Sequence, residues 1–372
     1  MKAYQDASLA PVRRAKALLE EMTLAEKIGQ LNQRLYGFRI YERKCVNGED
    51  TIELSEEFCQ EVEKYSGLGV LYGLYRADPW ADKNYETGLT GVLSKKAYNQ
   101  VQRYVLEHSR LGIPVMMSSE CPHGHQALDG YLLPVNLLAG ATFDPAMVRA
   151  AYRVSGRQLQ NMGVDLALMS MLDVLRDPRW GRSEECYSED PYLSARMAEA
   201  AVIGMQESGP EVVAKHFAAQ GEGTGGVNAS AARIGERELR EIHFPPAAAA
   251  IKAGAKGIMA AYNEIDGVYC HANRWLLNDV IRKEMGFDGI VMSDGVAIDQ
   301  LDSMTGDNVV SGALALQSGV DLGLWDEAFG KLEEAVRRGL VKEAQIDQAV
   351  LRVLTLKFER GLFEHPYLEE EG

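Results

Sequence analysis

Seven short apolar runs recur along the chain, and most of them are separated by stretches that have the pattern of a helix. The runs cover residues 68–74, 113–120, 164–174, 211–217, 256–263, 289–294 and 320–325. Strands that alternate with helices pair in parallel, because each crossover returns the chain to the same edge of the sheet. Both faces of a parallel sheet are buried, which explains why the runs are almost continuously apolar. The pattern therefore predicts an α/β fold.

Residues that start and stop helices lie between these runs. Three helices are predicted in this way, from Asp144-Pro145 to Gly163, from Asp190-Pro191 to near Gly209, and from Asn273 to Gly286. Asp and Asn cap helix N-termini, Pro fits the first turn, and Gly ends a helix. Ahead of the first run, VRRAKALLEEM has a helical pattern, and Thr23 followed by Glu26 forms a capping box that starts a second helix. Residues 37–66 are polar and less regular.

The number of strands decides between α/β architectures. A closed β/α barrel needs about eight strands, whereas the sequence offers seven. Either a weak strand lies elsewhere, with 296–312 as the first candidate, or the barrel is incomplete. A doubly wound open sheet is the alternative. We expect a (β/α)8 TIM-type barrel, complete or incomplete, in one domain over 1–372, with N-terminal helices and an irregular segment in 1–66 and the barrel in 67–363.

Composition excludes several classes of function. The 372 residues are 46% hydrophobic and 25% charged, as in ordinary globular proteins. A net charge of −15 argues against nucleic acid or an anionic membrane as partner. The first residues lack the apolar core of a signal peptide, and no run is long enough to span a bilayer. The five cysteines are scattered without a CxxC pair, which predicts reduced thiols, no zinc site and a cytoplasmic location.

Polar and aromatic residues stand where six consecutive runs end. They are Glu120, then Asp173 and Arg176, then Lys215 and His216, then Tyr262 and Asn263, then Asp294, and then Trp325. Helix capping explains a single Asp at such a place, but it does not predict Lys-His or Trp. The carboxyl ends of parallel strands meet at one edge, where ligands bind. Charged groups hydrogen-bond hydroxyls and an indole covers the apolar face of a sugar ring, so the set favours a polyol ligand.

Two further patterns are typical of ligand sites but have a structural explanation. GEGTGG at 221–226 fits a dinucleotide fingerprint, yet a loop follows it where that fingerprint requires a helix. His123 and His125 are two residues apart, and no carboxylate completes a set of metal ligands. We therefore predict neither a nucleotide cofactor nor a metal.

The residues at the run ends lie in motifs that resemble a known family. LDVLRDPRWGR with SEDP, AKHFAAQGEGTGG, AAYNEIDGVYCHAN and GFDGIVMSD resemble the successive signatures of glycoside hydrolase family 3. ECPHGHQALDG resembles the loop after the family's second strand, and the resemblance runs from about Met22 to about Phe363. The resemblance implies that the chain is the family's first domain, a β/α barrel that is sometimes incomplete.

The resemblance also implies roles for single residues. Asp294 matches the nucleophile that forms a covalent glycosyl-enzyme, and Tyr262 matches an aromatic hydroxyl beside it. Trp325 would cover the sugar ring. The residues that would hold the hydroxyls of the non-reducing-end sugar are Glu120, Arg176, Lys215 and His216.

Two residues depart from the family's pattern. Gly295 follows the nucleophile where the family usually has Trp, Tyr or Cys, so one wall of the sugar site is open or is filled from elsewhere. Glu120 stands where many glucosidases of the family have Asp, and Glu is commoner there in xylosidase-like members. Glucose or xylose therefore stays open as the preferred sugar.

The acid/base of the reaction is the third departure. Retaining hydrolysis needs a second carboxyl group about 5 Å from the nucleophile. Most of the family takes it from an α/β-sandwich domain that follows the barrel, and the chain ends where that domain would begin. Single-barrel relatives use an Asp-His dyad in the loop after KHF, but here that loop offers Glu222 as its only acid.

Three functions are compatible with the sequence. The first is a retaining exo-β-glycosidase acting on terminal β-D-glucosides or β-D-xylosides, without cofactor, with Asp294 as nucleophile and Glu222 as candidate acid/base. The second is a catalytically incomplete sugar-binding barrel that needs a second domain or subunit. The third is a Schiff-base lyase that uses the amine of Lys215.

Overall fold

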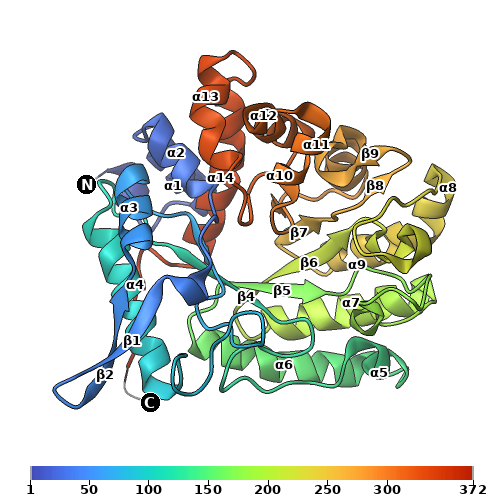
Figure 1. Cartoon of the computed structure of the whole chain (residues 1–372), viewed down its shortest axis with the longest axis horizontal. Helices are drawn as coiled ribbons and strands as arrows, with labels where there is room; N and C mark the ends of the chain where they lie inside the picture. Colours follow the sequence, from blue (N-terminus) through green and yellow to red (C-terminus); the bar gives the residue numbers. More distant parts are fainter. Residues whose placement is uncertain (1, 371–372) are drawn as a thin grey trace.

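The core of the protein is a parallel sheet of six strands in the order β10-β7-β6-β5-β4-β3. The structure is a computed structural model that describes residues 2–370. The strands are β3 (Val70–Tyr72), β4 (Met116–Glu120), β5 (Leu166–Ser170), β6 (Glu211–Phe217), β7 (Gly257–Ala260) and β10 (Ile290–Met292). The sheet is curled, with helices around it (Figure 1), so the prediction of a parallel α/β fold is confirmed as an incomplete α/β barrel.

The helices between the strands start as the sequence predicts. Asp144 accepts a hydrogen bond from the Met147 amide at the start of α6, and Asp190 caps α7 in the same way. The main crossover helices are α4 (Gly91–Glu107), α6 (Pro145–Asn161), α7 (Pro191–Gln206), α9 (Phe244–Lys252), the π-helix η8 (Trp275–Glu284), α12 (Asn308–Ser318) and α14 (Glu343–Glu359).

Two segments without regular strand structure lie between the edges of the sheet. Tyr36 forms a parallel bridge with Tyr72 of β3, and Leu322 forms one with Met292 of β10. The segments also bond to each other, because Gly323 N donates to Leu31 O at 3.0 Å. Residues 31–36 and 320–325 thereby connect β3 with β10.

The missing strand does not lie at 296–312, and that prediction is wrong. The segment forms α10 (Ala297–Gln300), α11 (Asp302–Thr305) and the start of α12. Asp307 caps α12 by accepting from the Val309 amide, so the polar residues in this segment serve helix starts.

The N-terminal part packs on the outside of the sheet. It contains α1 (Pro11–Leu19), α2 (Leu24–Gln30), the antiparallel strands β1 (Tyr41–Val46) and β2 (Glu49–Leu54), and α3 (Glu56–Tyr65). The predicted capping box of Thr23 and Glu26 is present at the start of α2. Residues 37–66 are more regular than expected, since they hold a hairpin and a helix.

Shorter elements complete the described chain. They are η1 (Ala3–Gln5), η2 (Gly37–Arg39), α5 (Asn136–Gly140), η3 (Ser183–Glu185), η4 (Gln220–Glu222), η5 (Thr224–Gly226), α8 (Glu236–Glu238), η6 (Leu239–His243), β8 (Glu264–Ile265), β9 (Val268–Tyr269), η7 (Cys270–Ala272), η9 (Phe329–Lys331) and α13 (Leu332–Arg337). Among residues 2–370, no helix is both long and apolar enough to cross a membrane.

Candidate active site

Asp294 lies two residues beyond β10 and its side chain is almost completely buried. Its Oδ1 accepts a hydrogen bond from the Gly295 amide at 2.8 Å, and its own amide donates to His271 Nε2 at 3.1 Å. The second carboxylate oxygen, Oδ2, is buried and has no hydrogen-bond partner. Buried polar atoms are normally paired, so this oxygen is available to a ligand.

His216, at the end of β6, is the neighbour of that oxygen. Its Nε2 lies 3.6 Å from Asp294 Oδ2, and its Nδ1 donates to Asp173 Oδ2 at 2.7 Å. Asp173 also accepts from the His216 and Gly221 amides at 3.2 Å, which fixes both the carboxylate and the ring. With the proton on Nδ1, Nε2 is an acceptor.

Arg182 supplies the donor for that acceptor. Its guanidinium lies 3.1 Å from His216 Nε2 and makes two hydrogen bonds to Glu185, of 2.7 and 2.8 Å. Burial opposes the charge of Arg182, but Glu185, Asp294 and Asp173 raise the pKa of its guanidinium above the ordinary value. Burial likewise works against the Glu185 carboxylate, but Arg182 holds its pKa well below the usual range. Sequence reasoning missed Arg182; its place three residues before Glu185 was the available signal.

A second charged pair lies at the ends of β4 and β6. Lys215 donates from Nζ to Glu120 Oε2 at 2.6 Å, and the Tyr72 hydroxyl donates to Glu120 Oε1 at 3.2 Å. Arg76 bonds to Tyr72 and lies 4.0 Å from Glu120. Burial acts to raise the pKa of Glu120, but Lys215 and Arg76 outweigh it and keep that pKa below the ordinary value. The carboxylate thus stays ionised at neutral pH.

Aromatic residues form the wall beside Asp294. The Tyr262 hydroxyl donates to Gly295 O at 2.9 Å, and burial together with the charge of Asp294 raises the pKa of Tyr262 well above its usual range. Trp325 packs against Gly295, since a Cβ atom at residue 295 would lie 2.3 Å from the indole. The wall that Gly295 fails to provide is therefore filled by Trp325.

Two predicted site residues lie apart from this group. Arg176 is partly exposed, with its Nε 3.3 Å from Glu222 Oε2 and a further carboxylate, that of Glu238, at 3.8 Å. Glu222 also lies 3.3 Å from His243 Nε2. The contact with His243 lowers the pKa of Glu222 most; burial acts to raise that pKa, and Arg176 lowers it further. The resulting lower pKa disfavours the protonated form that a general acid requires.

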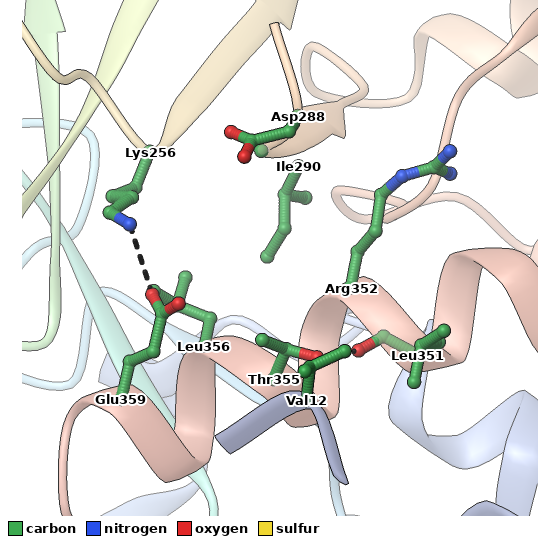
Figure 2. A pocket seen from close by; sticks show the side chains of 10 residues that line it. Val12, Lys256, Asp288, Ile290, Leu351, Arg352, Thr355, Leu356 and Glu359 are labelled. Carbon is green, nitrogen blue, oxygen red and sulfur yellow. Dashed lines mark hydrogen bonds and ion pairs between the residues drawn. The ribbon is translucent and has the colours of Figure 1, made fainter. Parts of the chain in front are cut away.

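A cavity of about 320 Å³ lies at the opposite end of the strands (Figure 2). Lys256, which precedes β7, is paired across it with Glu359 of α14 at 3.0 Å, and Asp288 precedes β10 (Figure 2). None of the strand-end residues lines this cavity. Within residues 2–370, no group of three His, Cys, Asp or Glu side chains is placed to hold a metal ion.

The arrangement therefore combines a buried carboxylate oxygen without a partner, an imidazole held in place by two neighbours, carboxylate and cationic side chains that can bind hydroxyls, and an aromatic wall. Such a set can hold the hydroxyls of a sugar while one carboxylate attacks its anomeric carbon.

Comparison with known proteins agrees with this chemistry. The family profile described as Glycosyl hydrolase family 3 N terminal domain matches residues 23–356. The chain is 34% identical to a putative beta-xylosidase of Formosa agariphila, over 100% of this chain and 48% of that protein. It is 32% identical to a periplasmic beta-glucosidase of Salmonella typhimurium, over 94% and 42%.

A solved structure gives the same picture. A mutant beta-glucosidase from Listeria innocua in complex with laminaribiose superposes with a TM-score of 0.82 at 30% identity, covering 96% of this chain and 48% of that one. The chain thus spans about half the length of the relatives it matches. The match over residues 23–356 shows that the chain belongs to glycosyl hydrolase family 3.

Proposed function

We propose that this chain carries the sugar site of a retaining exo-β-glycosidase that acts on terminal β-D-glucosides, and on β-D-xylosides as the second candidate sugar. The observation that carries the proposal is the unpaired Oδ2 of Asp294, which lies 3.6 Å from the fixed imidazole of His216. The printed names of the relatives, beta-glucosidase and beta-xylosidase, support both sugars.

Asp294 is the proposed nucleophile. Its Oδ2 attacks the anomeric carbon and the leaving oxygen departs, which yields a covalent glycosyl-enzyme with retained configuration after hydrolysis. Glu120, Lys215 and His216 hold hydroxyls of the sugar. For the arginine of this set we propose Arg182, which contacts His216, in place of Arg176, which pairs with Glu222.

The leaving group of a glycoside needs a proton donor. Glu222 is the acid predicted from the sequence, but its contacts with His243 and Arg176 favour the carboxylate. We therefore propose that a second domain or subunit supplies the acid/base, which agrees with the length of the relatives.

The alternative function is a sugar-binding barrel that lacks its acid/base. The same contacts support it, because they hold hydroxyls whether or not the reaction follows. The Schiff-base lyase is disfavoured, since Lys215 Nζ is engaged in a hydrogen bond of 2.6 Å to Glu120 Oε2.

Two further expectations remain proposals. A (β/α)8 barrel would result if residues 31–36 and 320–325 count as strands, which their bridges to β3 and β10 support.

A cytoplasmic location is supported by five free cysteines, although the Salmonella relative is named periplasmic. Cell fractionation with an antibody to the natural protein tests the location.

Covalent labelling tests the function. We would incubate the chain with 2,4-dinitrophenyl 2-deoxy-2-fluoro-β-glucoside and with its xylo analogue, because dinitrophenolate leaves without protonation and the missing acid does not matter. Peptide mass spectrometry is expected to find the label on Asp294, and the faster reagent identifies the preferred sugar. An unlabelled Asp294 with both reagents would reject the glycosidase and leave the sugar-binding barrel.

A further inference from the structure

Gly295 and Trp325 fit each other beside the nucleophile. A Cβ atom on residue 295 would lie 2.3 Å from both Cε3 and Cζ3 of the indole, closer than atoms of packed groups approach. Gly295 directly follows Asp294, and Trp325 comes from a segment about thirty residues further along the chain. We propose that the two residues form one unit that sets sugar specificity: glycine leaves the space free, and the indole becomes the wall that the sugar ring contacts. This inference rests on the proposed function.

The indole is fixed by other aromatic rings. Tyr36 stacks on it with ring centroids 4.8 Å apart and an interplanar angle of 26°, and Tyr72 meets it edge-on at 4.9 Å. Trp80 packs at 5.2 Å. Aromatic contacts of this kind stabilise one orientation, so the indole has little room to yield to a side chain at residue 295.

The two loops that carry the pair are joined. Asp326 accepts hydrogen bonds from Ser293 Oγ at 2.7 Å and from the Ile298 amide at 2.8 Å, which are residues on either side of Asp294. In the other direction, the Val296 amide donates to Leu324 O at 2.8 Å. The nucleophile and the indole are thereby held in one frame.

Both members of this frame offer an unpaired polar atom. Trp325 Nε1 is a buried donor without an acceptor, and Asp294 Oδ2 is a buried acceptor without a donor. Leaving either group unpaired costs free energy. Sugar hydroxyls both donate and accept, so a bound sugar could pair with each of these atoms, and Trp325 would then contribute a hydrogen bond as well as an apolar face.

The test is a double-mutant cycle on the covalent labelling rate. Gly295→Ala is expected to lower the rate with both 2-fluoro-glycosides about tenfold, because the methyl group clashes with the fixed indole and one of the two loops has to shift. In a Trp325→Ala background the same change is expected to have an effect of less than about twofold. Gly235→Ala is the matched control, since nothing lies within 4 Å of a Cβ atom there.

The specificity part uses single variants. Trp325→Ala is expected to change the glucoside-to-xyloside rate ratio about tenfold. Trp325→Phe, which removes the N–H donor and part of the ring surface, is expected to lower both rates about threefold. Thermal unfolding checks that each variant is folded, and Trp325→Leu replaces the alanine variant if that one is not. Two results overturn this inference alone, provided that the wild type is labelled. Either the Trp325 variants keep the wild-type glucoside-to-xyloside rate ratio, or the effects of the changes at residues 295 and 325 are additive.

If the wild type is not labelled, the proposed function fails and the inference is tested by binding. Calorimetric titration with glucose and with xylose then replaces the labelling rate in the same cycle. Coupled losses of affinity at residues 295 and 325 support the inference for a binding barrel. A wild type that binds neither sugar overturns it together with the proposed function.

Discussion

The two ends of the parallel sheet both hold buried ionisable side chains, but the central ones at each end differ in how they are paired. At the amino end, Lys357 of α14 donates to Gln30 Oε1 at 2.6 Å and to Pro114 O at 2.7 Å. Asp321 at the same end accepts two arginine hydrogen bonds of 2.6 Å and the Val291 amide at 2.9 Å. Each of these charges is fully engaged within the protein.

The carboxyl end differs in that respect. Asp294 Oδ2 and Trp325 Nε1 are buried without partners. Between Asp173 and Arg182, the ring of His216 is held in place by hydrogen bonds to both. The comparison indicates that burial and charge alone do not mark a functional site. Unpaired buried atoms also occur away from the site, as at Ser94 and Ser155, so they indicate a ligand site only where charged and aromatic side chains surround them.

The largest expected effect is at Asp294. Asp294→Asn removes the nucleophile, so the covalent label should be lost and the labelling rate should fall by more than about a thousandfold. Stability should instead rise by about 1 kcal/mol, because the amide places a donor near His216 Nε2 where an unpaired oxygen lay. Mass spectrometry and urea unfolding measure the two effects, and a variant that loses stability would contradict the comparison.

The opposite result is expected at Asp321. Asp321→Asn leaves Arg282 and Arg352 without their shared carboxylate, which should cost about 3–5 kcal/mol of unfolding free energy. The labelling rate per folded molecule should not change. Asp279→Asn, which breaks only an exposed pair with Lys283, is the control and should cost less than about 0.5 kcal/mol. A catalytic defect in folded Asp321→Asn would show that the two ends are not separate in role.

A smaller effect on the reaction is expected at Asp173. In the Asp173→Asn variant the side-chain amide can donate as well as accept, so it no longer fixes the proton of His216 on Nδ1. His216 Nε2 is then no longer a fixed acceptor for Arg182. We expect the labelling rate to fall about tenfold to a hundredfold, with a changed pH profile that a purely structural defect would not produce. Asp177→Asn, in the same loop but paired only with exposed Arg179, should leave rate and profile unchanged.

Sequence reasoning located most of the sheet because the strands are apolar on both faces. It missed residues 31–36 because two polar side chains interrupt the buried leucines there: Asn32 donates to Glu61 at 2.7 Å, and Gln33 accepts from Ser118 at 2.6 Å. Hydropathy does not reveal a barrel segment whose interior contacts are hydrogen bonds. The segment 296–312, which was predicted as the candidate for the missing strand, is helical instead.

At the site, the strand ends brought Glu120, Lys215, His216 and Asp294 together as expected from parallel pairing. The arginine could not be chosen in this way. Arg176 and Arg182 lie in one irregular loop after β5, and no periodicity tells which of them turns toward His216. Trp325 was predicted as a site residue, but its contact with Gly295 was not, because that contact depends on how two loops pack.

An effect on stability alone, with no change in the reaction, is the pH dependence that Lys357 contributes at the amino end. Burial lowers the pKa of its ammonium group from 10.5 to about 7. Between these values the unfolded chain binds one more proton than the folded chain, so unfolding free energy from this residue rises with pH from about 7 to about 10.5, by about 1 kcal/mol per pH unit. Below about pH 7 the contribution is constant, since both states then carry the proton. Urea unfolding at pH 7 and pH 9 measures the gain, which Lys357→Met should abolish while Lys283→Met, at an exposed lysine, retains it. A gain of equal size in all three proteins would assign the pH dependence to other groups, and the amino end would then owe its stability to packing and hydrogen bonds alone.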